Sequence, residues 1–295
     1  MSSSILVIGS RAQFGSEIFR LLSERYAVYG AARADLDITV ESAVIAYLRQ
    51  MRPGIVVHCA AWTDVDACEA DPDRAFAVNA EGTRCIATGC REIGATMIYV
   101  STDYVFDGQK KSPYVETDLP NPISVYGRSK LAGEKATADL VENHIIIRTS
   151  WMYGQTGKSF VRTMINLGQE QLDAREAGRK ADPIRVVSDQ TGSPTYAVDL
   201  ARQTQIVLDR RLYGVFHASG VGQTNWFAFA KDIFSYLTMP VDILPCSTEA
   251  LGQPAPRPGF SALQNRRLSE AGCNIMRPYQ SALEEFLGQY RAKTV

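Results

Sequence analysis

The sequence has few of the residues that build metal centres and disulfides. It contains three histidines, far apart, and six cysteines, none of which has a Cys-x-x-Cys partner. No zinc or haem spacing is present, so we predict no metal site. The cysteines are interpreted as buried or incidental thiols; they are Cys59, Cys68, Cys85, Cys90, Cys246 and Cys273.

The sequence also lacks an excess of either charge and any long apolar run. The formal net charge of the 295 residues is -1, which gives no electrostatic reason to expect nucleic acid or an anionic membrane as a partner. No apolar run approaches the roughly 20 residues of a membrane span. The residues after Met1 lead into a predicted strand and not a signal peptide, so we expect a cytoplasmic location.

Strand and helix patterns alternate through the first half of the chain. Short apolar runs are each followed by a segment with apolar residues at helical spacing. The predicted strands are 4–9, 27–33, 55–60, 96–101 and 144–149, and the predicted helices include 13–25, 40–51 and 72–93. Five such units in about 150 residues predict an α/β fold with a Rossmann-like doubly wound parallel sheet.

We divide the chain into two domains. Residues 1–150, with 184–218 returning to them, are assigned to a dinucleotide-binding domain; residues 151–183 and 219–295 are assigned to a smaller C-terminal substrate-binding domain. In the second part we predict a strand at 184–187, helices at 159–167, 197–208 and 224–237, and an extended segment at 240–258. The charged segment 168–182 is interpreted as an exposed, mobile loop.

The first predicted strand leads into a turn bounded by Gly9 and Gly15. In a dinucleotide-binding turn, the first glycine allows the tight turn, the last lets helix pack on strand, and the helix N-terminus offers free amides to a pyrophosphate. The middle position is Ala12, whose methyl group crowds the backbone that must approach the phosphate. By itself the turn therefore also fits a strand-to-helix connection without a ligand.

The second predicted strand ends at Arg33, where an NAD-preferring site usually has an acidic residue. A guanidinium there attracts a 2′-phosphate, and Arg11 in the glycine turn can reach the same phosphate. We therefore expect NADP as the cofactor, with NADPH preferred and NADH as the alternative. The other interpretation is that both arginines are solvated and bind no phosphate.

Tyr126 and Lys130 are four residues apart, which places them on one face of a helix. A free phenol with a pKa of about 10 is a poor acid at neutral pH, but a neighbouring positive charge lowers that pKa. The start of this helix and the strand end at Ser101 and Thr102 converge at the carboxyl edge of a parallel sheet, where ligands bind. The arrangement predicts general acid chemistry, although the spacing alone also describes an exposed helix face.

Several sequence blocks, in this order, carry a family resemblance: 101–108 (STDYVFDG), 126–134 (YGRSKLAGE), 148–154 (RTSWMYG) and 189–195 (DQTGSPT). Together they resemble the extended short-chain dehydrogenase/reductases and, more narrowly, the dTDP-4-dehydrorhamnose reductases. The similarity continues through 214–220 and 257–263, so it covers nearly the whole chain.

The resemblance implies roles for matching residues. Thr102 would hydrogen-bond the sugar carbonyl, Tyr126 would protonate its oxygen, and Lys130 would hold the nicotinamide ribose. Asp103 and Trp151 match positions that touch the sugar, with a loop cap and a core residue as the alternatives. The cofactor would be lined by Gly9, Arg11, Ala12, Gln13, Asp37, Ile38, Ala60, Ala61 and Trp62, in addition to Gly15 and Arg33.

The implied activity is NADPH-dependent reduction of the 4-keto group of a deoxysugar nucleotide, with dTDP-4-dehydro-L-rhamnose giving dTDP-L-rhamnose. Arg257 is our candidate for gripping the diphosphate of this nucleotide-sugar substrate, because arginine can bind phosphate oxygens bidentately. The alternatives are a sugar-nucleotide epimerase, a reductase of another keto-sugar, and a non-catalytic regulatory subunit on the same scaffold. For the oligomeric state, a homodimer is one of the alternatives that the sequence leaves open.

Overall fold

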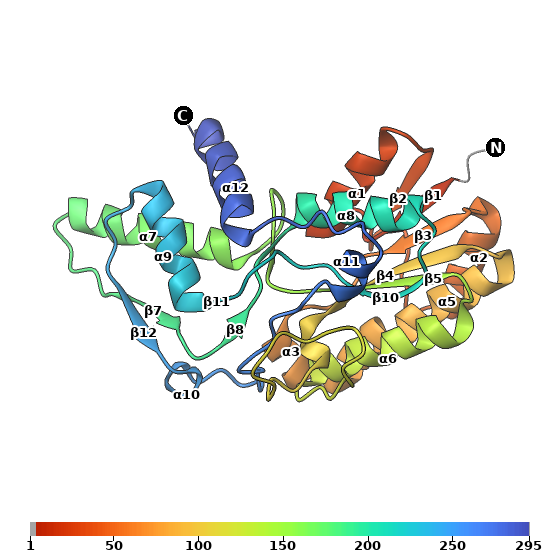
Figure 1. The fold of residues 1–295 in the computed structure, drawn as a ribbon, viewed down its shortest axis with the longest axis horizontal. Helices are drawn as coiled ribbons and strands as arrows, with labels where there is room; N and C mark the ends of the chain where they lie inside the picture. The colour runs from red at the N-terminus through yellow and green to blue at the C-terminus, as the bar shows by residue number, and fades with distance from the viewer. Residues whose placement is uncertain (1–3, 295) are drawn as a thin grey trace.

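The computed structural model describes residues 4–294, which are organised around a six-stranded sheet (Figure 1). The strand order is β10-β5-β4-β3-β1-β2, and every pairing is parallel. These strands are β1 (Ile5–Ile8), β2 (Val28–Ala31), β3 (Ile55–His58), β4 (Thr96–Thr102), β5 (His144–Thr149) and β10 (Gly214–His217). From β1 the chain adds β2 at one side and then β3, β4, β5 and β10 in turn at the other, which confirms the predicted Rossmann-like fold.

Helices cover both faces of this sheet. Alternate residues of β1 belong to different cores: Ile5 and Val7 pack towards one face, Leu6 and Ile8 towards the other. The first face is covered by α1 (Gln13–Ser23) and α8 (Ala197–Asp209), the second by α2 (Glu41–Met51), α5 (Gly82–Ile93) and α6 (Val125–Leu140). Burial on both faces explains why the strands are continuous apolar runs in the sequence.

The strand register brings distant residues to one edge of the sheet. Thr102 lies opposite Thr149 at the carboxyl ends of β4 and β5, and Ile8 lies opposite His58 at the ends of β1 and β3. The loops that follow these four strands therefore meet at the same edge. This edge positions the site described below.

A second part of the chain packs beside the carboxyl edge (Figure 1). Its core joins α7 (Phe160–Glu176), α9 (Trp226–Leu237) and α12 (Tyr279–Thr294), with aromatic side chains such as Tyr153, Tyr196 and Phe286 at the centre. Three two-stranded sheets accompany them: β6 (Met152–Tyr153) with β9 (Thr195–Tyr196), β7 (Ile184–Val187) with β12 (Ile243–Cys246), and β8 (Thr191–Gly192) with β11 (Thr224–Asn225).

Some element boundaries differ from the sequence-based prediction. The segment expected as a mobile loop at 168–182 is helical as far as Glu176, because Gly168 and Gln171 are buried and the Gln171 amide donates to the Asp242 carbonyl at 3.1 Å. The helix expected at 72–93 is divided into α4 (Pro72–Phe76), a π-helical turn (Ala77–Glu81) and α5. The remaining short helices are α3 (Val65–Ala70), the 3₁₀ turn Asp103–Val105, α10 (Thr248–Leu251), within the segment expected to be extended, and α11 (Arg266–Glu270).

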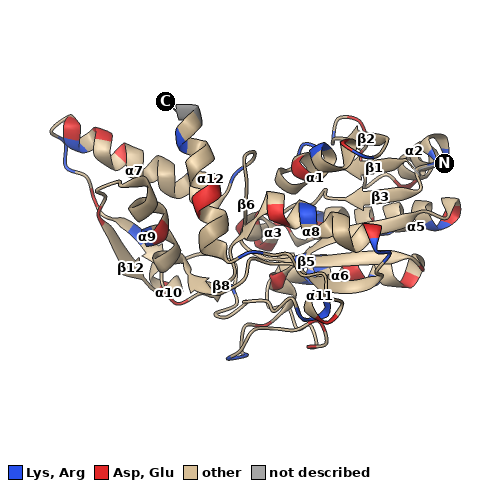
Figure 2. Ribbon diagram, turned by 45° about the horizontal axis from the view of Figure 1, so that its top comes forward, with Lys and Arg blue, Asp and Glu red and all other residues tan. Residues whose placement is uncertain are grey.

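Charged residues of both signs are interspersed over both parts of the molecule (Figure 2). This distribution agrees with a net charge of -1. Within residues 4–294, no helix has the length and apolar character that a membrane crossing requires.

Phe286→Ala is expected to lower the free energy of unfolding by about 3–5 kcal/mol, because it leaves a cavity among large rings. Phe286 is 0% exposed, and its ring centroid lies 5.4 Å from that of Tyr153 and 5.9 Å from that of Tyr196. Urea unfolding measures the change. Leu119→Ala is the control, because Leu119 is 89% exposed and its removal should cost less than about 0.5 kcal/mol. Equal losses in the two variants would contradict the assignment of this core.

Candidate active site

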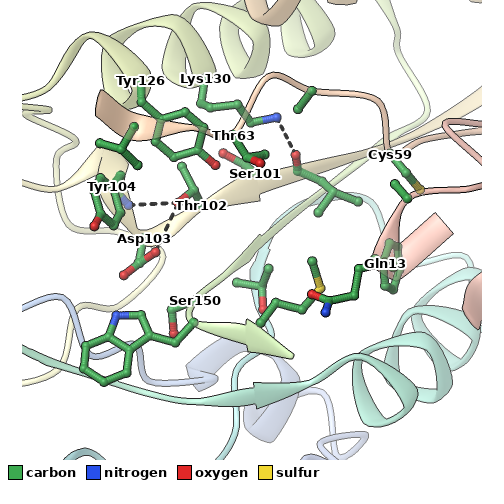
Figure 3. A pocket seen from close by; sticks show the side chains of 18 of the residues that line it. Gln13, Cys59, Thr63, Ser101, Thr102, Asp103, Tyr104, Tyr126, Lys130 and Ser150 are labelled. Atoms are coloured by element: carbon green, nitrogen blue, oxygen red, sulfur yellow. Dashed lines mark hydrogen bonds between the residues drawn. The ribbon is translucent and has the colours of Figure 1, made fainter. Parts of the chain in front are cut away.

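A cavity of about 420 Å³ opens at the carboxyl edge of the sheet (Figure 3). The loops after β1, β3, β4 and β5 and the start of α6 form most of its wall, and α9 adds one aromatic ring. The lining residues are Ala12, Gln13, Phe14, Cys59, Ala61, Thr63, Val65, Val100, Ser101, Thr102, Asp103, Tyr104, Tyr126, Lys130, Thr149, Ser150, Trp151, Met152, Lys158 and Trp226.

Tyr126 and Lys130 both face this cavity from the first turns of α6. The helix begins after Ser124, whose hydroxyl accepts a hydrogen bond from the Gly127 amide at 3.1 Å. Both side chains are buried, and the Lys130 ammonium donates to the Val100 carbonyl at 2.7 Å (Figure 3). The nitrogen also lies 4.1 Å from the centroid of the Tyr99 ring. The structure therefore brings the predicted pair together in one concave site.

Burial controls the protonation of this pair. It raises the pKa of Tyr126; a hydrogen bond with Thr102 lowers that pKa, and the Asp103 carboxylate raises it. Burial lowers the pKa of Lys130 to about 7, against the opposing effect of the Glu134 carboxylate. The expected acidification of the phenol by the ammonium is wrong for this arrangement, because desolvation is the largest influence on the pKa of Tyr126 and raises it. Tyr126 is a protonated phenol at neutral pH.

Thr102 and Asp103 form the adjoining wall at the end of β4. The Thr102 hydroxyl donates to the Asp103 carboxylate at 3.1 Å and accepts from the Tyr104 amide at 3.2 Å. The Ser261 hydroxyl donates to the other carboxylate oxygen at 2.5 Å. Burial raises the pKa of Asp103 to about 7, although the hydrogen bonds from Ser261 and Thr102 lower it. Both residues line the cavity, and they also cap the turn that follows β4.

Two stacked tryptophans close one side of the cavity. The ring centroids of Trp151 and Trp226 are 3.4 Å apart and their planes differ by 8°. Trp151 has a φ of 45°, a left-handed conformation that costs a non-glycine residue of order 1 kcal/mol. Its ring covers Gly192, where an added Cβ would lie 2.3 Å from the indole. The surrounding structure therefore holds Trp151 in a strained conformation at the cavity wall.

Neither glycine of the turn has room for a side chain. Gly9 has a φ of 81°, and an added Cβ would lie 2.6 Å from the Ala60 nitrogen; at Gly15 it would lie 2.0 Å from the Gly9 carbonyl oxygen. The residue before α1 is Ala12, which supplies no side-chain cap to the first amides. Free amides at a helix N-terminus attract anions, so the start of α1 fits a pyrophosphate.

Comparison with known proteins shows the family to which the chain belongs. A family model described as the RmlD substrate binding domain matches residues 3–292. The chain belongs to this family. The dTDP-4-dehydrorhamnose reductase of Streptomyces griseus is 39% identical over 288 residues, which is 95% of this chain and 91% of that relative.

Solved structures are equally similar to this RmlD-family chain. A dTDP-4-dehydrorhamnose reductase from Clostridium acetobutylicum has a TM-score of 0.92 at 39% identity, covering 98% of this chain and 99% of its own. The dTDP-4-dehydrorhamnose reductase of Bacillus anthracis, solved in complex with NADP, also has a TM-score of 0.92, at 40% identity, covering 98% of this chain and 100% of its own.

Several residues predicted for the site lie outside the cavity of this RmlD-family protein. Gly9, Arg11, Gly15, Arg33, Asp37, Ile38, Ala60 and Trp62 do not line it; they sit at or just after the carboxyl ends of β1, β2 and β3. Arg11 and Arg33 are exposed there. Asp37 accepts hydrogen bonds from the backbone and hydroxyl of Thr39, which lower its pKa.

Arg257 is also outside the cavity. Its guanidinium binds both oxygens of Asp66, at 3.0 and 2.8 Å, and donates to the Ala255 carbonyl. The sequence-based assignment of Arg257 to a diphosphate therefore has no support in this geometry, because its fork is already bound to a carboxylate. Asp66 is far from Arg257 in the sequence, so the pairing had no local signal.

Other lining residues were not predicted from the sequence; they include Thr63, Ser150, Lys158 and Trp226. Trp226 lies within the helix predicted at 224–237. It is the first residue of α9, directly after the Asn225 cap, and its indole nitrogen donates to Gln190 at 3.1 Å. In the sequence, the one signal that the Trp226 ring could lie at the cavity was its position near the start of the predicted helix.

Asp103→Asn is expected to make folding stability less sensitive to pH. The folded pKa of Asp103, about 7, lies above the ordinary aspartate value of 3.8, so the folded state binds more protons between these values and its stability falls as pH rises through them. Urea unfolding at about pH 5 and about pH 8 should show the variant gaining about 1–3 kcal/mol over the wild type at the higher pH. An equal difference at both pH values would contradict a buried, proton-binding Asp103.

Proposed function

We propose that this RmlD-family protein is an NADPH-dependent reductase of the 4-keto group of a deoxysugar nucleotide, converting dTDP-4-dehydro-L-rhamnose to dTDP-L-rhamnose. The observation that carries the proposal is the convergence of Tyr126, Lys130 and Thr102 on one cavity beside the start of α1. The names of the relatives, and NADP in the Bacillus anthracis structure, support the same substrate class and cofactor.

The proton donor in this reaction is Tyr126. NADPH, when bound, supplies the hydride. When the sugar binds, the Thr102 hydroxyl turns its proton from the Asp103 carboxylate to the sugar carbonyl, and Tyr126 transfers its own proton to the oxygen that becomes negative. The raised pKa of Tyr126 keeps the proton in place at neutral pH until the oxyanion forms, and a phenol remains a stronger acid than the alcohol product. Both donors act in a buried site, where such interactions are stronger than in water.

The cofactor would be held by groups that follow β1 and β2 and by Lys130 on α6. The turn from Gly9 to Gly15 and the free amides of α1 fit the pyrophosphate. Arg11 and Arg33 are exposed at the ends of β1 and β2, where they can reach a 2′-phosphate. Lys130 faces the cavity and serves the nicotinamide ribose.

The substrate occupies the side of the cavity formed with the second part of the chain. Trp151 and Trp226 form an apolar wall for the sugar, and Lys158 adds a cation for its diphosphate. The two separate cores support two domains, residues 1–150 for the dinucleotide and 151–183 with 219–295 for the substrate. Since β7, β8 and β9 pair with β12, β11 and β6 of the second part, we place the return to the first domain at α8, continuing to 218.

A cytoplasmic location is part of the same proposal. All six cysteines lie among the described residues as free thiols, which suits a reducing compartment. A homodimer is proposed as well, and light scattering coupled to gel filtration measures it directly.

The test is a panel of 4-keto sugar nucleotides assayed with NADPH and with NADH. Oxidation of NADPH with the dTDP-linked 4-keto sugar supports the proposal. Protein isolated with tightly bound NAD and no net oxidation would identify an epimerase instead. Failure to bind NADPH in a fluorescence titration would indicate a non-catalytic subunit.

Tyr126→Phe is expected to lower kcat by about 10²–10⁴-fold, because it removes the proton donor and leaves the ring in place. The affinity for NADPH should change by less than about threefold, since the hydroxyl acts on the reacting oxygen. Stopped-flow absorbance of NADPH and a fluorescence titration measure the two quantities. Tyr213→Phe, at an exposed position, is the control. Full activity of the Tyr126 variant would end the assignment.

Arg33→Ala is expected to raise the Kd for NADPH by about 10–100-fold, the value of one charge-assisted hydrogen bond to phosphate. The Kd for NADH should stay within about twofold, because NADH has no 2′-phosphate. Fluorescence titrations with both cofactors measure this, with the exposed Arg91→Ala as control. A parallel loss of NADH affinity would show that Arg33 supports the fold of the site and does not bind the phosphate.

A further inference from the structure

A buried ion pair next to the cavity has no part in the reaction described above. Glu134 lies on α6, one turn after Lys130, and Arg148 lies on β5. Their side chains are each 5% exposed, and the Arg148 guanidinium binds both carboxylate oxygens, at 2.9 and 2.7 Å. The carboxylate therefore connects α6 to the sheet in the interior of the protein.

Ser101 is the third member of this cluster. Its hydroxyl donates to Glu134 at 2.5 Å, and in the strand register it lies opposite Arg148. Ser101 stands between Val100, whose carbonyl accepts from the Lys130 ammonium, and Thr102. The same carboxylate thus holds the strand segment that carries the proposed carbonyl donor and the acceptor of Lys130.

The cluster joins α6 to the sheet at a high cost in desolvation free energy. A buried ion pair often contributes no more stability than apolar residues of the same volume, because both charges lose their hydration. In the described part of the chain, one guanidinium nitrogen of Arg148 also has no hydrogen-bond partner. These costs point to a task other than stability.

The titratable groups that face Lys130 indicate what the ion pair does. On α6 these groups are Tyr126 and Glu134; His58 and Cys59 come from β3 and its end, and Tyr99 from β4. Burial raises the pKa of Cys59 and of Tyr99 and lowers that of His58 to about 3, so all three are neutral at pH 7. Within residues 4–294, Glu134 is the one anion in this set.

We propose that Glu134 is a positioning residue for the reduction: its charge keeps the buried Lys130 cationic, and its hydrogen bond to Ser101 fixes the strand end that carries Thr102. This inference rests on the proposed function. The pKa of Lys130, about 7, is already lowered by burial, so loss of the Glu134 charge lowers it further and leaves a neutral amine at pH 7.

Glu134→Gln tests the charge directly. Protein with ¹³C-labelled lysine side chains is titrated by NMR, and the Lys130 signal is assigned from a Lys130→Met variant. We expect the Lys130 titration to move down by about one unit or more, and the basic limb of the kcat pH profile to move with it. The KM for the sugar nucleotide should change by less than about threefold. If neither the Lys130 titration nor the kcat pH profile moves in the folded variant, the proposal is overturned.

Two single variants, together with the double variant in the next paragraph, separate a positioning role from a contribution to stability. Glu81→Gln breaks an exposed pair with Arg84 and should change nothing. Ser101→Ala should lower kcat by about 10-fold and leave the Lys130 titration in place; an unchanged kcat would overturn the part of the proposal that concerns Thr102.

Glu134→Gln is expected to lower the melting temperature by roughly 5–10 °C, because it leaves a buried cation unpaired. The double variant Glu134→Met/Arg148→Met should recover the melting temperature without recovering the Lys130 titration. Recovery of both would show that the pair is structural only. If the wild type oxidises NADPH with none of the keto-sugars, the proposed function fails, whereas the NMR titration still decides whether Glu134 sets the charge of Lys130.

Discussion

The close approach of α6 to the carboxyl end of β4 is the constraint on which the site depends. A Cβ at Gly127 would lie 2.1 Å from the Tyr104 carbonyl oxygen, and a Cβ at Gly133 would lie 2.4 Å from the Tyr99 hydroxyl. Only glycine at these positions lets the helix lie so near the strand. Because it does, Tyr126 and Lys130 reach the cavity while their backbones remain in a regular helix.

Burial that follows from this packing decides the chemistry more than pairwise attraction does. Tyr126, Lys130 and Asp103 are all buried, and in each case the neutral form gains at the expense of the charged form. The Tyr126 phenol therefore keeps its proton, close to the Thr102 hydroxyl. The buried carboxylate of Glu134, held by Arg148, is the charge that opposes this trend for the lysine.

The second part of the chain completes the cavity through aromatic contacts. Trp151 follows β5 after one residue, Ser150, so the end of the sheet and the wall of the cavity are one continuous segment. Its left-handed backbone is held by stacking on Trp226 and by the open face of Gly192. The geometry of this wall therefore depends on α9 and on the core around Phe229 and Phe286 that supports it.

The features that depend on neighbours along the chain could be predicted from the amino-acid sequence. The parallel sheet followed from the alternation of apolar runs with helical spacing, the glycine turn from Gly9 and Gly15, and the shared face of Tyr126 and Lys130 from their separation of one helical turn. Each of these is set by local backbone geometry. The family resemblance then connected them to one site.

Tertiary structure alone decided how buried polar groups are partnered. Arg257 pairs with Asp66, Glu134 pairs with Arg148, and Gln171 continues a helix through a segment whose charges had predicted a loop. The pKa of Tyr126 is likewise set by desolvation and not by its helical neighbour. Partner choice and burial depend on which distant segments meet, and the sequence pattern contains no measure of that distance.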